Sequence, residues 1–187
     1  MKTIDFIIDK KEVLRYAGHK GETVTRYIDQ LAESVILQCK SVVTPRSVVR
    51  RCGILQQENG VKITGTNLIM YGEDIKKHLE GCDECYVMCV TAGVGADALI
   101  RTMMAVDTAH GLLADGAATA AVESCCDNIE AQLRKELEKE NKSYLITSQT
   151  HSSAQHYKHL GTFFAKRSHK FYRLNSHSQN ESITTVG

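Results

Sequence analysis

The stretch Tyr86-Val87-Met88-Cys89-Val90-Thr91-Ala92-Gly93-Val94-Gly95 decides the fold class. Its first seven residues are nearly all apolar or small, which predicts a buried strand, and the two glycines end it. Two helical segments follow, from Ala96 to about Leu113 and from about Asp115 to Lys139. Because strands and helices do not alternate regularly along the chain, the order favours an α+β fold over a doubly wound sheet.

The chain before this stretch contributes two helices and then strands. Asp9 can cap a short helix that ends at Gly18, and helical spacing of apolar residues continues over residues 22–40. From Ser41 to Met70 the apolar period changes to two, with Asn59-Gly60 as a hairpin signal. A short helix over residues 72–79 follows. The sequence therefore predicts a single α+β domain with a mainly antiparallel sheet and long helices packed on it.

Composition sets broad limits on the class of protein. With 187 residues, 42% of them hydrophobic, the chain can bury a core without a disulfide framework or a metal. Seven cysteines, an odd number, are typical of reduced thiols. No apolar run is long enough to cross a membrane, and the first residues lack an export signal. We therefore expect a cytoplasmic protein without membrane association.

Charge divides the chain into two parts. Residues 1–141 carry 17 Lys/Arg and 21 Asp/Glu, a net −4, whereas residues 142–187 carry 6 and 1, a net +5. The second part is rich in Ser, Thr, His, Gln and Asn and shows little apolar patterning, which is also typical of mobile chain. We expect a body over 1–141 and a divergent, basic C-terminal part of the same domain over 142–187. The cations do not alternate with aromatic residues, so nucleic-acid binding is not favoured.

Several groupings have two interpretations each, a site or ordinary packing. The turn at Gly93 and Gly95 resembles an anion-binding loop but lacks a third glycine and a Lys-Ser/Thr pair, which favours a tight turn. Cys82, Cys85 and Cys89 could hold a metal, yet residues 85 and 89 of a strand lie about 13 Å apart, which favours packing. Five histidines of the basic part could bind a metal but have no acid or thiol partner nearby. They are His151, His156, His159, His169 and His177. We predict no metal site and, without a nucleophile matched to a base, no catalytic residue.

Glu123 is the candidate binding residue. It follows the small residues Ala117, Ala118, Ala120 and Ala121 on the predicted last helix. An acid among small side chains leaves room for a ligand, although it is also an ordinary arrangement at the edge of a helix.

Four segments resemble the activation domain family of vitamin B12-dependent methionine synthase, particularly its stand-alone members. Three are Glu12-Val13-Leu14-Arg15-Tyr16-Ala17-Gly18-His19-Lys20-Gly21, Thr44-Pro45-Arg46 and Gly72-Glu73-Asp74-Ile75-Lys76-Lys77-His78-Leu79-Glu80-Gly81-Cys82. The fourth and most specific runs from the strand ending in Thr91-Ala92-Gly93 through residues 107–116 to Ala120-Ala121-Val122-Glu123. Together they cover residues 10 to about 140.

The resemblance implies a function as well as a fold. Members bind S-adenosylmethionine and dock over the cobalamin of a partner module, which is reduced and remethylated, so the domain is an accessory to methyl transfer rather than a self-contained catalyst. Glu123 matches a glutamate that touches S-adenosylmethionine in the family. The family's Arg-x-x-x-Gly-Tyr ligand stretch should fall at about 142–150, where this chain has Lys142-Ser143-Tyr144-Leu145-Ile146-Thr147-Ser148-Gln149-Thr150, without arginine or glycine. The resemblance thus implies an altered methyl-donor site, with Gln179–Gly187 similar to the family's closing segment.

Three hypotheses follow. The first is a stand-alone activation module that reactivates a corrinoid protein with S-adenosylmethionine. The second is a non-catalytic protein that docks a corrinoid module or another acidic partner through its basic C-terminal part. The third is a decayed copy with a stable body and a poorly folded C-terminus.

Overall fold

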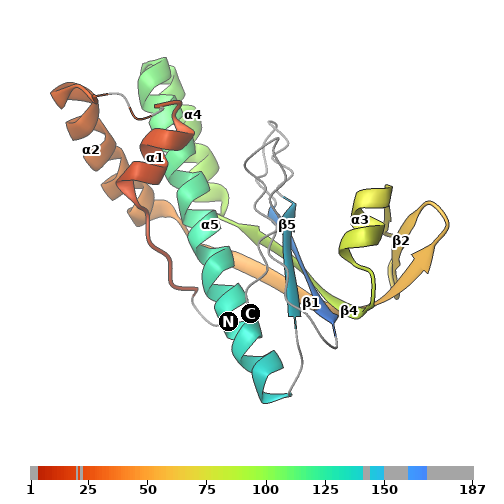
Figure 1. Cartoon of the computed structure of the whole chain (residues 1–187). Helices are drawn as coiled ribbons and strands as arrows, with labels where there is room; N and C mark the ends of the chain where they lie inside the picture. The colour runs from red at the N-terminus through yellow and green to blue at the C-terminus, as the bar shows by residue number, and fades with distance from the viewer. Residues whose placement is uncertain (1–3, 20, 22, 141–143, 150–159, 168–187) are drawn as a thin grey trace. The chain divides into compact units, whose positions relative to one another are not determined.

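The computed structural model describes residues 4–19, 21, 23–140, 144–149 and 160–167. Helices and strands follow in the order α1, α2, β1, β2, β3, α3, β4, α4, α5, β5 and β6 (Figure 1). The strands form one sheet in the order β3-β2-β1-β4-β6-β5, with antiparallel ladders between β1 and β2, β2 and β3, and β5 and β6. The α+β class, with antiparallel strands and long helices, is confirmed.

The chain divides into two compact units. One consists of Met1–Ser47, Val90–Glu130 and Ser152–Leu160, and its described part is mainly helical. The other consists of Val48–Cys89, Ala131–His151 and Gly161–Gly187, and it carries most of the sheet. We call them the helical unit and the sheet unit. The proposed division of the chain at Asn141 stays a prediction.

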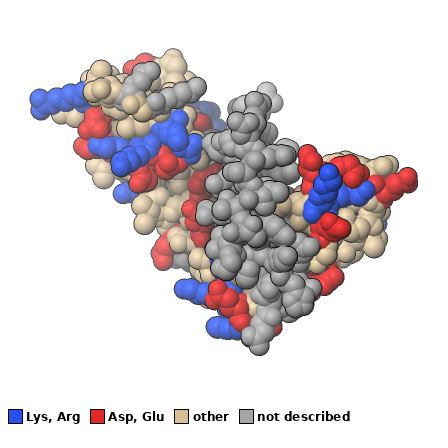
Figure 2. Space-filling model, in the orientation of Figure 1, with Lys and Arg blue, Asp and Glu red and all other residues tan. Residues whose placement is uncertain are grey.

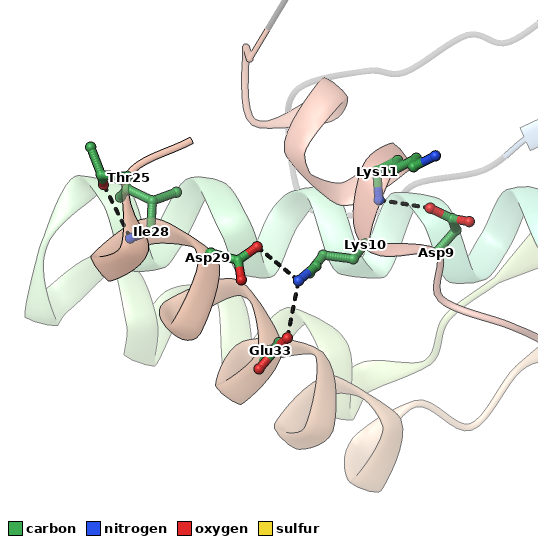
Figure 3. A network of polar contacts seen from close by, with 7 residues as sticks. All are labelled: Asp9, Lys10, Lys11, Thr25, Ile28, Asp29 and Glu33. Carbon is green, nitrogen blue, oxygen red and sulfur yellow. Dashed lines mark hydrogen bonds and ion pairs between the residues drawn. The ribbon is translucent and has the colours of Figure 1, made fainter. Parts of the chain in front are cut away.

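The helical unit begins with two capped helices. The Asp9 side chain accepts from the N–H of Lys11 at 2.6 Å and so caps α1 (Lys10–Tyr16), as predicted. Helix α2 (Arg26–Val42) is capped by Thr25 and therefore starts four residues later than apolar spacing predicts. The Lys10 ammonium on α1 contacts Asp29 at 2.7 Å and Glu33 at 3.0 Å on α2 (Figure 3). Figure 2 shows acidic and basic side chains intermixed on the face that carries α1.

The break between the last two helices lies at Asp107, not near Ala114 as the sequence interpretation placed it. Helix α4 (Val94–Val106) ends where Asp107 adopts an extended backbone, and α5 (Thr108–Lys139) begins with the Asp107 carboxylate accepting from the N–H of His110 at 2.9 Å. The same carboxylate contacts the His110 ring at 2.8 Å. An aspartate whose side chain accepts from the N–H three residues later is a typical N-cap, so Asp107 could have marked the start of α5 in the sequence.

The predicted hairpin is confirmed, but its glycine has a different role. Strands β1 (Arg46–Gln57) and β2 (Gly60–Ile63) pair from Gln57↔Gly60, so Glu58 and Asn59 form the connection. Gly60 already belongs to β2, where an added Cβ would collide with the carbonyl oxygen of Met70 on β3 (Ile69–Tyr71). The glycine is therefore required by close approach of a neighbouring strand.

The sheet unit buries its own apolar cluster beneath the short helix α3 (Glu73–His78). Strand β4 (Cys82–Thr91) begins four residues before the predicted start. The cluster consists of Cys52, Val61, Ile63, Ile75, Leu79, Cys82 and Cys85, with Ile54, Met70 and Val87 packed against it. Strands β5 (Tyr144–Gln149) and β6 (Leu160–Arg167) lie in the part of the chain for which the sequence predicted no strand. None of the helices in the described residues has the length and apolarity needed to span a bilayer.

An ion-pair network ties elements of the sheet unit that are distant in sequence. Arg51 on β1 contacts Glu84 on β4 at 2.7 Å and Glu140, just after α5, at 3.1 Å. The Arg51 side chain is 32% exposed, so water screens these pairs only in part. We expect Arg51→Met to lower the free energy of unfolding by about 1 kcal/mol, measured by urea denaturation, and the loss to shrink in high salt. Arg46→Met, an exposed arginine on the same strand, should have a smaller effect; equal losses would contradict the role of the network.

Candidate functional site

Glu123 lies on α5 where the N-terminal segment runs along the helix. The Asn128 side-chain amide donates to the Asp5 carbonyl at 2.7 Å, and the Ile7 N–H donates to Ser124 Oγ at 2.9 Å. Farther back on α5, the space at Gly116 is filled by the Val13 carbonyl, 2.7 Å from where a Cβ would stand. The segment and α1 are therefore antiparallel to α5, with Glu123 on the covered stretch.

The surroundings of Glu123 disfavour its negative charge. The side chain is half-buried, and this burial is the main cause that raises its pKa above the ordinary value. Asp127, one turn later on the same helix, raises the pKa further, as does Glu12, whereas Arg15 lowers it. Among the residues that the structure describes, none donates a hydrogen bond to the Glu123 carboxylate.

Arg15 is the cation of this neighbourhood, and it is shared with other groups. Its guanidinium contacts the Glu12 carboxylate at 2.5 Å and lies over the Tyr16 ring, 4.1 Å from the centroid. Burial raises the pKa of Tyr16, and the charge of Glu123 raises it further. The charge of Arg15 is thus balanced by Glu12. The other two acids near Tyr16, Glu123 and Asp127, leave this group of residues with a net negative charge.

This arrangement suits a cationic group. A positive ligand atom beside Glu123 would supply the charge that Arg15 supplies only in part, and it would lower the pKa of the carboxyl. The described residues hold no group of three or more His, Cys, Asp or Glu that could bind a metal ion. The balance of charge around Glu123 therefore favours a positively charged group.

The small residues near Glu123 do not leave the room that the sequence suggested. The alanines are buried, with relative exposures from 0 to 5%, and the helix packs closely against its neighbours. Gly111 lies against Met104 on α4, and Gly116 against Val13 on α1. Small side chains on α5 therefore serve close approach of helices.

The glycine-rich turn is confirmed as a packing feature. Gly93 caps α4 with φ 89°, and an added Cβ would stand 2.8 Å from the carbonyl oxygen of Thr44. A Cβ on Gly95 would stand 2.5 Å from the Val42 carbonyl oxygen. The chain at Val42 and Thr44 therefore lies where side chains at Gly95 and Gly93 would stand, which fits a tight turn.

The cysteines also pack, with one exception. Six are buried, while Cys89 is exposed. The packing interpretation is thus confirmed for Cys82 and Cys85 and is wrong for Cys89. Burial, with smaller contributions from Cys52 and Cys82, raises the pKa of the Cys85 thiol to about 12. The histidines of the basic part lie outside the described residues, as do the residues flanking β5 in the stretch 142–150.

These environments predict selective thiol chemistry. In the native protein at about pH 8, we expect iodoacetamide to modify Cys89 at least about tenfold faster than any other cysteine, because buried neutral thiols react slowly. Peptide mass spectrometry after timed labelling measures the rates. Labelling in urea, where all seven thiols should react alike, is the control. Fast native labelling of Cys85 or Cys125 would contradict the burial.

Sequence reasoning missed three residues of the site, which are Arg15, Tyr16 and Asp127. Asp127 follows Glu123 by four positions on a helix, which is the spacing of neighbours on one face, so it was detectable. Tyr16 lies in a segment that resembles the activation family, but nothing in its local sequence relates it to a residue on the last helix.

The fold defines a class, an α+β domain with antiparallel strands and long helices, and one solved structure of that class is similar to it. The crystal structure of the MetH reactivation domain bound to AdoHcy is 13% identical, with a TM-score of 0.51, over 83% of this chain and 68% of that chain. No family model and no curated protein matches the chain. The likeness shows a relationship of fold alone.

Proposed function

We propose that this protein is an activation-type module that binds S-adenosylmethionine at Glu123 and supports reductive reactivation of a cobalamin or corrinoid partner protein. It acts as an accessory to cobalamin-dependent methyl transfer and makes no covalent bond itself. The observation that carries the proposal is a half-buried Glu123 of raised pKa in a fold similar to a reactivation domain that holds AdoHcy.

The chemistry of the ligand fits the charge at Glu123. S-Adenosylmethionine carries an ammonium and a sulfonium group, both positive, whereas S-adenosylhomocysteine retains only the ammonium. A carboxylate that is partly desolvated and beside Asp127 gains most from a ligand with more positive charge. We therefore expect both ligands to bind, with S-adenosylmethionine the tighter.

Thermal unfolding with and without ligand tests the proposal. At a ligand concentration about 100 times the dissociation constant, binding adds about 2.7 kcal/mol, or roughly 5 to 10 °C in Tm for a chain of this size. The shift should disappear in Glu123→Ala and persist in Glu138→Gln, an exposed carboxylate on the same helix. No shift at millimolar S-adenosylmethionine would exclude a working donor site and favour a decayed copy.

A second function rests on the charge asymmetry of the sequence, −4 over residues 1–141 and +5 over 142–187. In this alternative the basic part docks an acidic surface, such as that of a corrinoid module, without a methyl donor. Association should then weaken steeply between low and physiological salt. Binding that is independent of salt would count against it.

A further inference from the structure

A hollow lies in the sheet unit. It has a volume of about 490 Å³ and is lined by Leu55, Lys62, Thr64, Gly65, Thr66 and Asn67. The register of the strands places Leu55 opposite Lys62, and Lys62 opposite Ile69, on one face of the β1–β2–β3 meander. The neighbouring pair Ile54↔Ile63 belongs to the apolar cluster. The hollow therefore lies on the face that is turned away from this cluster.

The hollow is lined by donors that are not used elsewhere. Within the described residues, the Lys62 ammonium, the Thr64 hydroxyl and the Asn67 amide have no hydrogen-bond or ion-pair partner. The backbone N–H groups of Gly65 and Asn67 also donate to no described atom. None of the lining residues is acidic. Donors without acceptors, together with one cation, make the hollow suitable for an anion.

The turn that presents these donors is fixed by its own contacts. The Thr66 hydroxyl donates to the Ile63 carbonyl at 2.8 Å and accepts from the Leu68 N–H at 3.0 Å. The Thr64 N–H donates to the Gly53 carbonyl at 2.9 Å. Gly65 has φ 74°, and a guanidinium nitrogen of Arg50 lies 3.6 Å from where its Cβ would stand, so a second cation is beside the turn.

We propose that this hollow binds the phosphate group of a small organic phosphate, with the apolar part of the ligand against Leu55. Phosphate oxygens can accept several hydrogen bonds at once, which matches Lys62, Thr64, Asn67 and the turn N–H groups better than a planar carboxylate does. The volume is in the range of sites for small organic ligands and exceeds the need of a bare ion. Leu55 is 53% exposed and supplies the apolar wall.

Nuclear magnetic resonance titration of the ¹⁵N-labelled protein with phenyl phosphate, at constant ionic strength set by sodium chloride, tests the site. We expect saturable shifts confined to residues 53–55 and 62–68. Lys62→Gln should weaken binding about tenfold or more, since a charge-assisted hydrogen bond is lost. Lys77→Gln, at an exposed position on α3, is the matched control and should bind like the parent. The spectra themselves report whether each variant is folded.

The same titration with inorganic phosphate is the second part of the test. Binding of phenyl phosphate that is about threefold or more tighter supports an organic ligand, whereas equal affinity overturns the role of Leu55. Absence of saturable shifts, or equal binding by Lys62→Gln, overturns the site. Glu123→Gln should bind phenyl phosphate normally, so failure here is distinguishable from failure at Glu123.

Discussion

Gly93→Ala is expected to lower the free energy of unfolding by about 2 to 6 kcal/mol. Two costs add at this position. The backbone has φ 89° and ψ 165°, a conformation that costs an L-residue about 1 to 3 kcal/mol. The new Cβ would also stand 2.5 Å from Thr44 Oγ1 and 2.8 Å from the Thr44 carbonyl oxygen, and such overpacking costs about 1 to 3 kcal/mol. Thr44 cannot move away freely, because its N–H donates to the Ala92 carbonyl at 2.9 Å.

Gly18→Ala separates the two costs. Gly18 has φ 98°, but nothing lies within 4 Å of its added Cβ, so only the backbone cost applies. Urea denaturation of both variants gives each loss, and the difference measures the clash with Thr44. Equal losses in the two variants would mean that the chain at Thr44 gives way, and that the turn is less tightly packed than the structure shows.

Gly93 illustrates what the sequence could predict. The glycine after a buried strand marked the end of β4 and the start of a helix, and the tight turn was the favoured interpretation. The residue that makes the glycine necessary is Thr44, which is distant in sequence and carries no local sign of the contact. Asp9 shows the opposite case: its cap bonds only the next residues of the chain, so its role was predicted correctly.

The errors have two origins, a local signal that was overlooked and contacts between residues distant in sequence. The helix break was placed near Ala114 because apolar spacing continues past Asp107, although the cap at Asp107 was a local signal. Strands β5 and β6 show little alternation of apolar residues, and their pairing, from Tyr144↔Lys166 to Gln149↔Gly161, is not encoded in a hairpin turn signal. At the candidate site, Glu123 was predicted, whereas its neighbour Tyr16 depends on how α1 packs along α5.

Glu123→Gln is expected to remove the response to S-adenosylmethionine while making the ligand-free protein slightly more stable at neutral pH. The loss corresponds to the ligand term of about 2.7 kcal/mol at about 100 times the dissociation constant. The gain should be smaller, about 0.5 kcal/mol, because Glu123 is only half-buried and a like-charge neighbour at i,i+4 costs a few tenths of a kcal/mol.

The pH dependence identifies the cause of the gain. Because the folded protein raises the pKa of Glu123, protonation of this group stabilises the fold. This stabilisation is lost as the pH rises from the ordinary pKa of a glutamate through the raised pKa of Glu123 in the folded protein. The glutamine variant does not lose this stability, because its side chain does not ionise. Its stability should therefore equal that of the parent at about pH 4 and exceed it at neutral pH, as measured by urea denaturation at both pH values.

Opposite signs for stability and ligand response distinguish a binding residue from a structural one. If Glu123 only supported the packing of α1 on α5, its replacement would lower stability at neutral pH and leave any ligand shift intact. Glu136→Gln, on an exposed part of the same helix, should change neither quantity. A half-buried acid beside a second acid lowers the stability of the ligand-free protein. Such an arrangement is expected at a binding site, where a bound cation offsets the negative charge, because functional sites commonly lower the stability of the fold.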